Sequence, residues 1–230
     1  MWTSIDPGAT VKMSDQRDDD VLANDGSGVQ RSMKSTHHPL TVLRCKVAIV
    51  GDSKVGKTAL KEMFISGGRN YLGEYNMTAG VDFKVKSIPI PDTNVEVELY
   101  MFDCGGEKIF QQREGYSAYF ENTAMCAVIY DVGTPTTLQS CGRWLSAVRH
   151  SRPDRPIPGV LIANKVDLYK SKPDCLNSEA GQRFASTNGL KFFEASAKEN
   201  QDVDAPFNFL ANEFYRQYQL HLETVKKNTR

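Results

Sequence analysis

The chain has 230 residues, and its 28 basic and 28 acidic side chains give a formal net charge of zero. This balance provides no field that would attract nucleic acid or an anionic membrane, so we expect neither as a partner. The length suits one α/β domain with extensions. No apolar run reaches the roughly 18 residues that a membrane-spanning helix needs.

The cysteines are scattered, and none belongs to a Cys-x-x-Cys pair or a zinc pattern. We therefore expect reduced thiols rather than disulfides. Residue 2 is Trp and the last five residues contain no cysteine, so neither N-myristoylation nor prenylation is expected. The sequence thus predicts a soluble, intracellular protein without a lipid anchor of its own.

Residues 1–43 are rich in Ser, Asp, Gly and Thr and have only isolated apolar side chains. Such a segment buries too little apolar surface to offset its ordering entropy, so we expect a disordered N-terminal extension. Its Asp18–Asp20 run and its His37-His38 pair raise the alternative of a metal site. A solvated tail is favoured, because no further ligands share a suitable spacing.

The first ordered element is an apolar strand over residues 45–50, followed by the stretch GDSKVGKT and then by a helix over residues 57–66. Gly-x-x-x-x-Gly-Lys-Thr between a strand and a helix is the phosphate-binding P-loop. Lys57 would place its charge on the outer phosphates, and Thr58 would offer a hydroxyl to Mg²⁺. The residues expected to bind the phosphates are Gly51, Asp52, Ser53, Lys54, Val55, Gly56, Lys57, Thr58 and Ala59.

Beyond the P-loop, strand and helix patterns alternate, which predicts a mostly parallel, doubly wound α/β sheet flanked by helices. Two period-two segments, 81–88 and 95–101, are separated by a turn at 90–94 and predict one antiparallel hairpin. Later strands are expected at 124–130, 159–163 and 190–194, and helices at 136–148, 178–187 and 204–225.

The stretch Asn164-Lys165-Val166-Asp167, which follows a buried strand, indicates which base the site recognises. The Asp167 carboxylate can accept hydrogen bonds from N1–H and the 2-amino group of guanine, a donor pair that adenine lacks. The stem of Lys165 can cover one face of the base. Asn164 can either bond the base edge or brace the P-loop. Backbone N–H groups of Ser196, Ala197 and Lys198, after the last strand, can meet the guanine carbonyl.

Two further stretches predict where the metal and the γ-phosphate bind. Asp103 ends a strand and can hold Mg²⁺, while Gly106 can offer its N–H to the γ-phosphate. Thr78 can reach the metal with its hydroxyl and the γ-phosphate with its N–H. Thr58, Thr78 and Asp103 are thus the candidate metal residues, and the segments around Thr78 and Gly106 are the candidate nucleotide switches.

All five guanine-nucleotide boxes occur in order, and residues 44 to about 220 resemble a Rab-like small GTPase of the Ras superfamily. The stretch YNMTAGVDF at 75–83 is similar to the Rab switch I signature. The resemblance implies a P-loop NTPase fold with a six-stranded sheet in a domain over 44–225, with 226–230 as a tail. It also implies GTP and GDP as ligands, with Mg²⁺.

Within this superfamily, the chain resembles in particular the Rab-like GTPase of the intraflagellar transport B complex. Residues 88–93, 157–161, 204–207 and 213–218 carry this resemblance. It implies a heterodimer with the jelly-roll intraflagellar transport subunit twenty-five, contacts with other B-complex subunits, and a location in the cilium or flagellum as well as the cytoplasm. The alternatives are a Rab-type membrane-traffic switch and a pseudo-GTPase that binds no nucleotide.

Glu107 departs from the Rab pattern, which has glutamine after the glycine that matches Gly106. The glutamine orients the attacking water, whereas ionised Glu107 only accepts hydrogen bonds and adds charge near the γ-phosphate. We therefore expect slow GTP hydrolysis, with Glu107, Thr78 and Gly106 at the catalytic positions. Glu107 could instead point into solvent, but a water-positioning residue would still be missing.

The last helix carries Phe207, Leu210, Phe214, Tyr218 and Leu222 at helical spacing. We expect the part up to Phe214 to cover the sheet. Tyr218, Leu222 and Val225 extend beyond it in sequence and are candidates for a partner surface. Phe209 and Tyr215 are expected to lie off this face.

Overall fold

The computed structural model describes residues 41–228 apart from 75, 107–115, 154–155 and 171–177. Its centre is a six-stranded sheet with the strand order β2-β3-β1-β4-β5-β6. The strands are β1 (Thr41–Val50), β2 (Val81–Pro89), β3 (Val95–Cys104), β4 (Met125–Asp131), β5 (Gly159–Asn164) and β6 (Leu190–Ala195). The helices are α1 (Lys57–Ser66), α3 (Pro135–His150), α4 (Ser178–Thr187) and α5 (Asp204–Asn228), with short 3-10 helices at Tyr116–Phe120 and Val166–Lys170.

The sheet is parallel except for the β2–β3 pair, so the predicted fold class and the predicted hairpin are confirmed. In that pair Asp82 lies opposite Asp103. The carboxyl ends of the five parallel strands meet at one edge of the sheet, and the loops that follow them carry the predicted site. This edge is where doubly wound sheets bind ligands.

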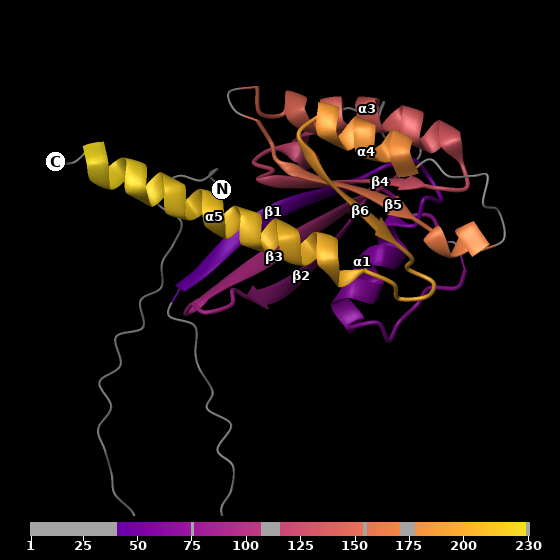
Figure 1. Cartoon of the computed structure of the whole chain (residues 1–230), viewed down its shortest axis with the longest axis horizontal. Helices are drawn as coiled ribbons and strands as arrows, with labels where there is room; N and C mark the ends of the chain where they lie inside the picture. The colour runs from indigo at the N-terminus through magenta and orange to yellow at the C-terminus, as the bar shows by residue number, and fades with distance from the viewer. Residues whose placement is uncertain (1–40, 75, 107–115, 154–155, 171–177, 229–230) are drawn as a thin grey trace, which may run out of the picture.

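Two layers of helices cover the sheet. Figure 1 shows α3 and α4 together on one face, with α1 and α5 on the other. The two cores follow this division: one joins alternate residues of the central strands to Phe64 and Phe207, and the other joins the remaining strand residues to Trp144. Because β4 and β5 are buried on both faces, they are apolar at nearly every position.

The first strand is longer than the sequence predicted. It begins at Thr41 rather than Cys45, and thus before the expected domain start at residue 44. The reason is tertiary, because Leu43 is buried and pairs with Val97 of β3. Arg44 separates Val42 and Leu43 from the apolar run that begins at Cys45, so the run alone did not reveal this extension. Elsewhere the strand and helix bounds match the predicted ones or differ from them by at most three residues.

Helix α5 runs from Asp204 to Asn228, beyond the predicted end at residue 225, and projects away from the sheet (Figure 1). As expected, Phe207, Leu210 and Phe214 are buried. Phe209 and Tyr215, expected off this apolar face, are partly buried and pack against the core, and so does Tyr218. Across the described part of the chain, no helix is both long enough and apolar enough to span a bilayer.

Candidate functional site

The P-loop joins β1 to α1 and curls around the Lys57 ammonium. Lys57 is only 6% exposed, and its Nζ donates to the carbonyl oxygens of Gly51 and Asp52, each at 3.0 Å. Gly56 caps α1 with φ 94°, a left-handed conformation that suits glycine. A Cβ on Gly56 would also collide with the Asn164 side chain, so this turn requires glycine on two grounds.

A cavity of about 280 Å³ opens in front of this loop. The predicted site residues on its wall are Ser53, Lys54, Gly56, Lys57, Thr58, Ala59, Thr78, Gly106 and Lys165. The loop before β2 adds Tyr71, Leu72, Gly73, Glu74 and Asn76, which the sequence did not single out. Gly51, Asp52 and Val55 belong to the loop but do not line the cavity.

Asn164 connects the predicted base-binding stretch to the P-loop. Its side-chain Nδ2 donates to the carbonyl oxygen of Val55 at 2.8 Å, and its Oδ1 accepts from the N–H of Ala197 at 3.2 Å. Asn164 is 1% exposed. The sequence left two roles open for Asn164, and its contacts in the structure are those of a brace for the P-loop. Its buried amide links the end of β5 to the P-loop and to the turn after β6.

Asp167 and the turn after β6 also meet. The hydroxyl of Ser196 donates to Asp167 Oδ1 at 2.7 Å and accepts from the N–H of Glu199 at 3.1 Å. This arrangement fixes the carboxylate against a buried residue. Lys198 is exposed. The cavity wall includes none of the predicted residues Asn164, Asp167, Ser196, Ala197 and Lys198.

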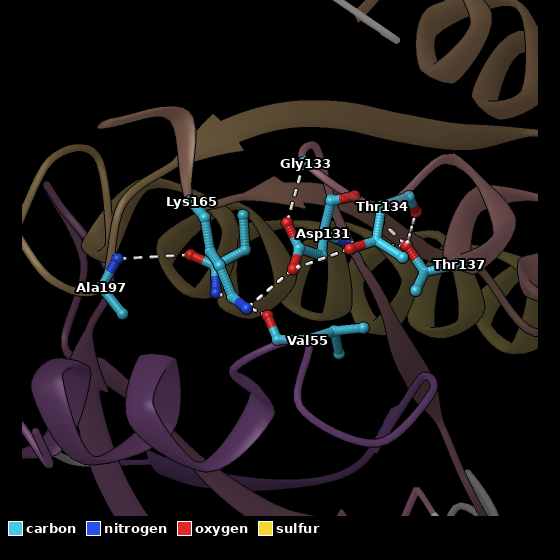
Figure 2. A network of polar contacts seen from close by, with 8 residues as sticks. Val55, Asp131, Gly133, Thr134, Thr137, Lys165 and Ala197 are labelled. Carbon is cyan, nitrogen blue, oxygen red and sulfur yellow. Dashed lines mark hydrogen bonds and ion pairs between the residues drawn. The ribbon is translucent and has the colours of Figure 1, made fainter. Parts of the chain in front are cut away.

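Lys165 is oriented by Asp131, a residue that the sequence analysis missed. Lys165 Nζ lies 2.7 Å from Asp131 Oδ2, and Figure 2 shows this ion pair together with the hydrogen bond from the N–H of Gly133 to Asp131 Oδ1. Lys165 itself has a left-handed φ of 69°. The position of Asp131 in the sequence could have identified it. It is the last residue of β4, just as Asp103 and Asn164 lie at or next to the ends of β3 and β5.

The three candidate metal residues come together where Thr58 and Thr78 line the cavity, with Asp103 behind Thr58. Thr58 Oγ1 donates to Asp103 Oδ2 at 2.5 Å and lies 3.0 Å from Thr78 Oγ1. Asp103 is fully buried, and among the described residues its Oδ1 has no hydrogen-bond partner. Burial raises the pKa of Asp103, and the nearby Lys61 charge and the Thr58 hydroxyl offset this only in part.

This set of residues fits Mg²⁺. Two hydroxyls and a carboxylate are the hard oxygen donors that the ion prefers, and Asp103 Oδ1 is a buried acceptor without a partner in the described structure. The few protein ligands also suit an ion that keeps several of its waters.

Gly106 lies against the P-loop, where a Cβ would come within 2.6 Å of Lys57 Nζ. Only glycine permits this approach, as expected for a backbone N–H that faces a phosphate. The next residue, Glu107, lies outside the described residues, so its role at the catalytic position stays a prediction.

Two further contacts around the P-loop were not predicted. The indole Nε1 of Trp144 donates to Asp52 Oδ1 at 2.7 Å, which ties the loop to α3. On α1, Lys61 is fully buried beside Asp103. A lysine three residues after Thr58 shares its helix face, but this spacing alone does not distinguish a buried lysine from an exposed one.

A P-loop braced from the loop after β5, on a doubly wound sheet, defines the P-loop NTPase class of fold. Comparison with protein families identifies the family within this class, since the sequence model of the Ras family matches residues 46–216. The chain therefore belongs to the Ras family, in the branch of the intraflagellar transport protein 27 homologues.

Individual relatives support this placement. The chain is 41% identical over 180 residues to intraflagellar transport protein 27 of Chlamydomonas reinhardtii, covering 77% of this chain and 87% of the relative. It is 40% identical over 176 residues to the Mus musculus homologue of that protein, covering 76% and 92%. The Arabidopsis thaliana Ras-related protein RABA5d is more distant, at 31% over 186 residues, with 79% and 80% covered.

Proposed function

We propose that the chain binds GTP and GDP with Mg²⁺ and works as a slow nucleotide-dependent switch in an intraflagellar transport complex. Ras-family GTPases share this nucleotide and metal chemistry. The observation that carries the proposal is the pair of hydrogen bonds of Asn164, one donated to the Val55 carbonyl and one accepted from the Ala197 N–H, because they link a base-recognition loop to a phosphate loop.

In this proposal, different residues of the chain bind the phosphates, the base and the metal. The P-loop amides and Lys57 bind the phosphates, Asp167 accepts from the guanine edge, and Lys165 covers one face of the base. Tyr71 lines the cavity and offers an aromatic ring for stacking. Thr58, Thr78 and Asp103 hold Mg²⁺, which would neutralise phosphate charge when bound.

Base selectivity tests the proposal. Fluorescent GDP and ADP analogues are titrated against the purified chain freed of nucleotide, and we expect GDP to bind at least about a hundredfold more tightly. The variant Asp167→Asn replaces an acceptor by an amide that can donate to the 2-oxo group of xanthine. It should lose GDP and gain xanthosine diphosphate. Equal binding of GDP and ADP, or binding of neither, would refute the proposal.

We further propose that the chain acts in the cilium or flagellum and cytoplasm, paired with the jelly-roll subunit twenty-five and associated with other B-complex subunits. The names of the relatives and the exposed end of α5 support this assignment. A membrane-traffic Rab is the second candidate. Capture of partners by the tagged full chain from ciliated cells separates them: transport subunits support the first, and Rab exchange factors without transport subunits support the second.

A further inference from the structure

A buried lysine lies where this fold has its candidate metal residues. Lys61, on α1, has no exposed side-chain surface. Its Nζ lies 3.4 Å from Asp103 Oδ2 and also forms an ion pair with Asp82 Oδ2. A third carboxylate, that of Glu62, is 3.5 Å away. One cation thus contacts three acidic side chains.

The contacts of Lys61 link β3, which carries Asp103, to the start of β2, which follows the segment of Thr78. Asp103 Oδ2 accepts from Thr58 as well as from Lys61, so one carboxylate oxygen is shared by a candidate metal residue and an ammonium group. Asp82 lies opposite Asp103 in the β2–β3 pair, at the start of β2. The segment that carries Thr78 leads directly into β2, so Lys61 also fixes the strand that anchors this segment.

Lys61 is charged in the folded protein. Burial alone would lower its pKa, but the negative charges of Asp103 and Asp82 outweigh burial and leave the pKa raised. The pKa of Asp82 is lowered by the hydrogen bond and charge of Lys61, against the opposing effect of burial. The three carboxylates around Lys61 Nζ, those of Glu62, Asp82 and Asp103, favour its charged ammonium form.

We infer that Lys61 acts as a fixed internal cation that weakens Mg²⁺ binding at Asp103 and makes nucleotide retention less dependent on the metal. This inference rests on the proposed nucleotide binding. A cation near Asp103 repels a divalent ion that approaches the same carboxylate. When the metal leaves, the same cation still compensates the negative charge of Asp103, so the nucleotide phosphates meet less repulsion.

Two substitutions have opposite expected effects. Lys61→Met keeps the length and apolar stem of the side chain and removes its charge, so the Mg²⁺ midpoint for retaining fluorescent GDP should fall by about tenfold. Asp82→Asn removes a negative charge and leaves Lys61 to Asp103, so the midpoint should rise by about threefold. A merely structural role of the ion pair would move both midpoints in the same direction.

The experiment measures release of a fluorescent GDP analogue from the full chain at buffered Mg²⁺ concentrations and in EDTA. Lys61→Met should release the analogue about tenfold faster than wild type in EDTA, while saturating Mg²⁺ abolishes this difference. Lys61→Arg keeps the charge and should behave as wild type. Arg183→Met, a charge change at an exposed residue of α4, controls for net charge.

Unchanged midpoints in Lys61→Met and Asp82→Asn would overturn the inference, and so would shifts of the same sign. If Lys61→Met fails to fold by circular dichroism, the direction of the Asp82→Asn shift decides alone. Failure of the wild-type chain to bind GDP would refute the proposed function instead, which makes the two failures distinguishable.

Discussion

The Asn164 side chain donates to the backbone carbonyl of Val55 at 2.8 Å, across 109 residues of sequence. This hydrogen bond is buried, and it joins the end of β5 to the middle of the P-loop. Asn164 also accepts from Ala197, so the phosphate and base ends of the site share one amide. The base-binding loop and the phosphate loop therefore share one buried support.

Replacing Asn164 by Ala should damage both stability and binding. The change leaves the Val55 carbonyl and the Ala197 N–H without their buried partner, which should lower the free energy of unfolding by about 3 kcal/mol. GDP affinity should fall by at least about tenfold because the two loops lose their common support. Urea unfolding and titration of fluorescent GDP measure the two effects.

Asn212→Ala provides the matched control. Asn212 lies on the exposed side of α5, and its Nδ2 donates to the Asn208 carbonyl at 2.8 Å within the same helix. Because water can replace this contact, both stability and GDP affinity should stay within about 0.5 kcal/mol of wild type. Equal losses in Asn164→Ala and Asn212→Ala would contradict the bracing role of Asn164.

Much of the fold was predictable because its signals are local. The P-loop spacing fixed the junction of β1 and α1, and the alternating residues at 81–88 and 95–101 identified the β2–β3 pair. The order of the strand-end motifs brought Asp103, Asn164 and Asp167 to one edge of the sheet. These features depend on residue type and spacing within short segments.

Other features depend on tertiary contacts and left no such signal. Lys61 looked like an ordinary polar position of a helix, yet Asp82 and Asp103 on two strands enclose it. Tyr71 lies in an irregular loop, so no periodic pattern could predict that it lines the cavity. The early start of β1 follows from its pairing with β3.

Glu107→Gln should accelerate GTP hydrolysis. Glutamine can donate to and accept from the attacking water, whereas ionised glutamate only accepts and adds charge near the γ-phosphate. We expect single-turnover hydrolysis to rise by about tenfold. Glu107→Ala, which removes the charge without supplying a donor, separates the two effects. If Glu107→Gln were no faster than wild type, the explanation of slow turnover by this residue would fail.

The outer end of α5 should carry the contact with the jelly-roll subunit. Leu222 and Val225 are 37% and 42% exposed, and their spacing of three residues puts them on the face that Tyr218 shares. Leu222→Asp combined with Val225→Asp should weaken co-purification with subunit twenty-five by at least about tenfold. Thermal stability of the free chain should be unchanged, because neither side chain is in the core.

Leu220→Asp is the control for that face. Leu220 is 49% exposed but lies two residues from Leu222, on a different side of the helix. It adds one negative charge to the same segment and should leave pairing intact. Loss of pairing in Leu220→Asp alone, with pairing retained in the double variant, would place the contact on the opposite side of α5.

The buried thiols should make the protein lose stability at alkaline pH. Burial raises the pKa of Cys126 to about 12, from an ordinary value of 9.0. Above pH 9.0 the unfolded chain releases this proton and the folded chain keeps it, so the free energy of unfolding falls by up to about 1.4 kcal/mol per pH unit. Cys126→Ala should show a correspondingly shallower fall in urea unfolding between about pH 9 and 10.5, although the cavity makes it less stable at pH 7. Parallel pH curves for the two proteins would show that Cys126 ionisation is not coupled to folding.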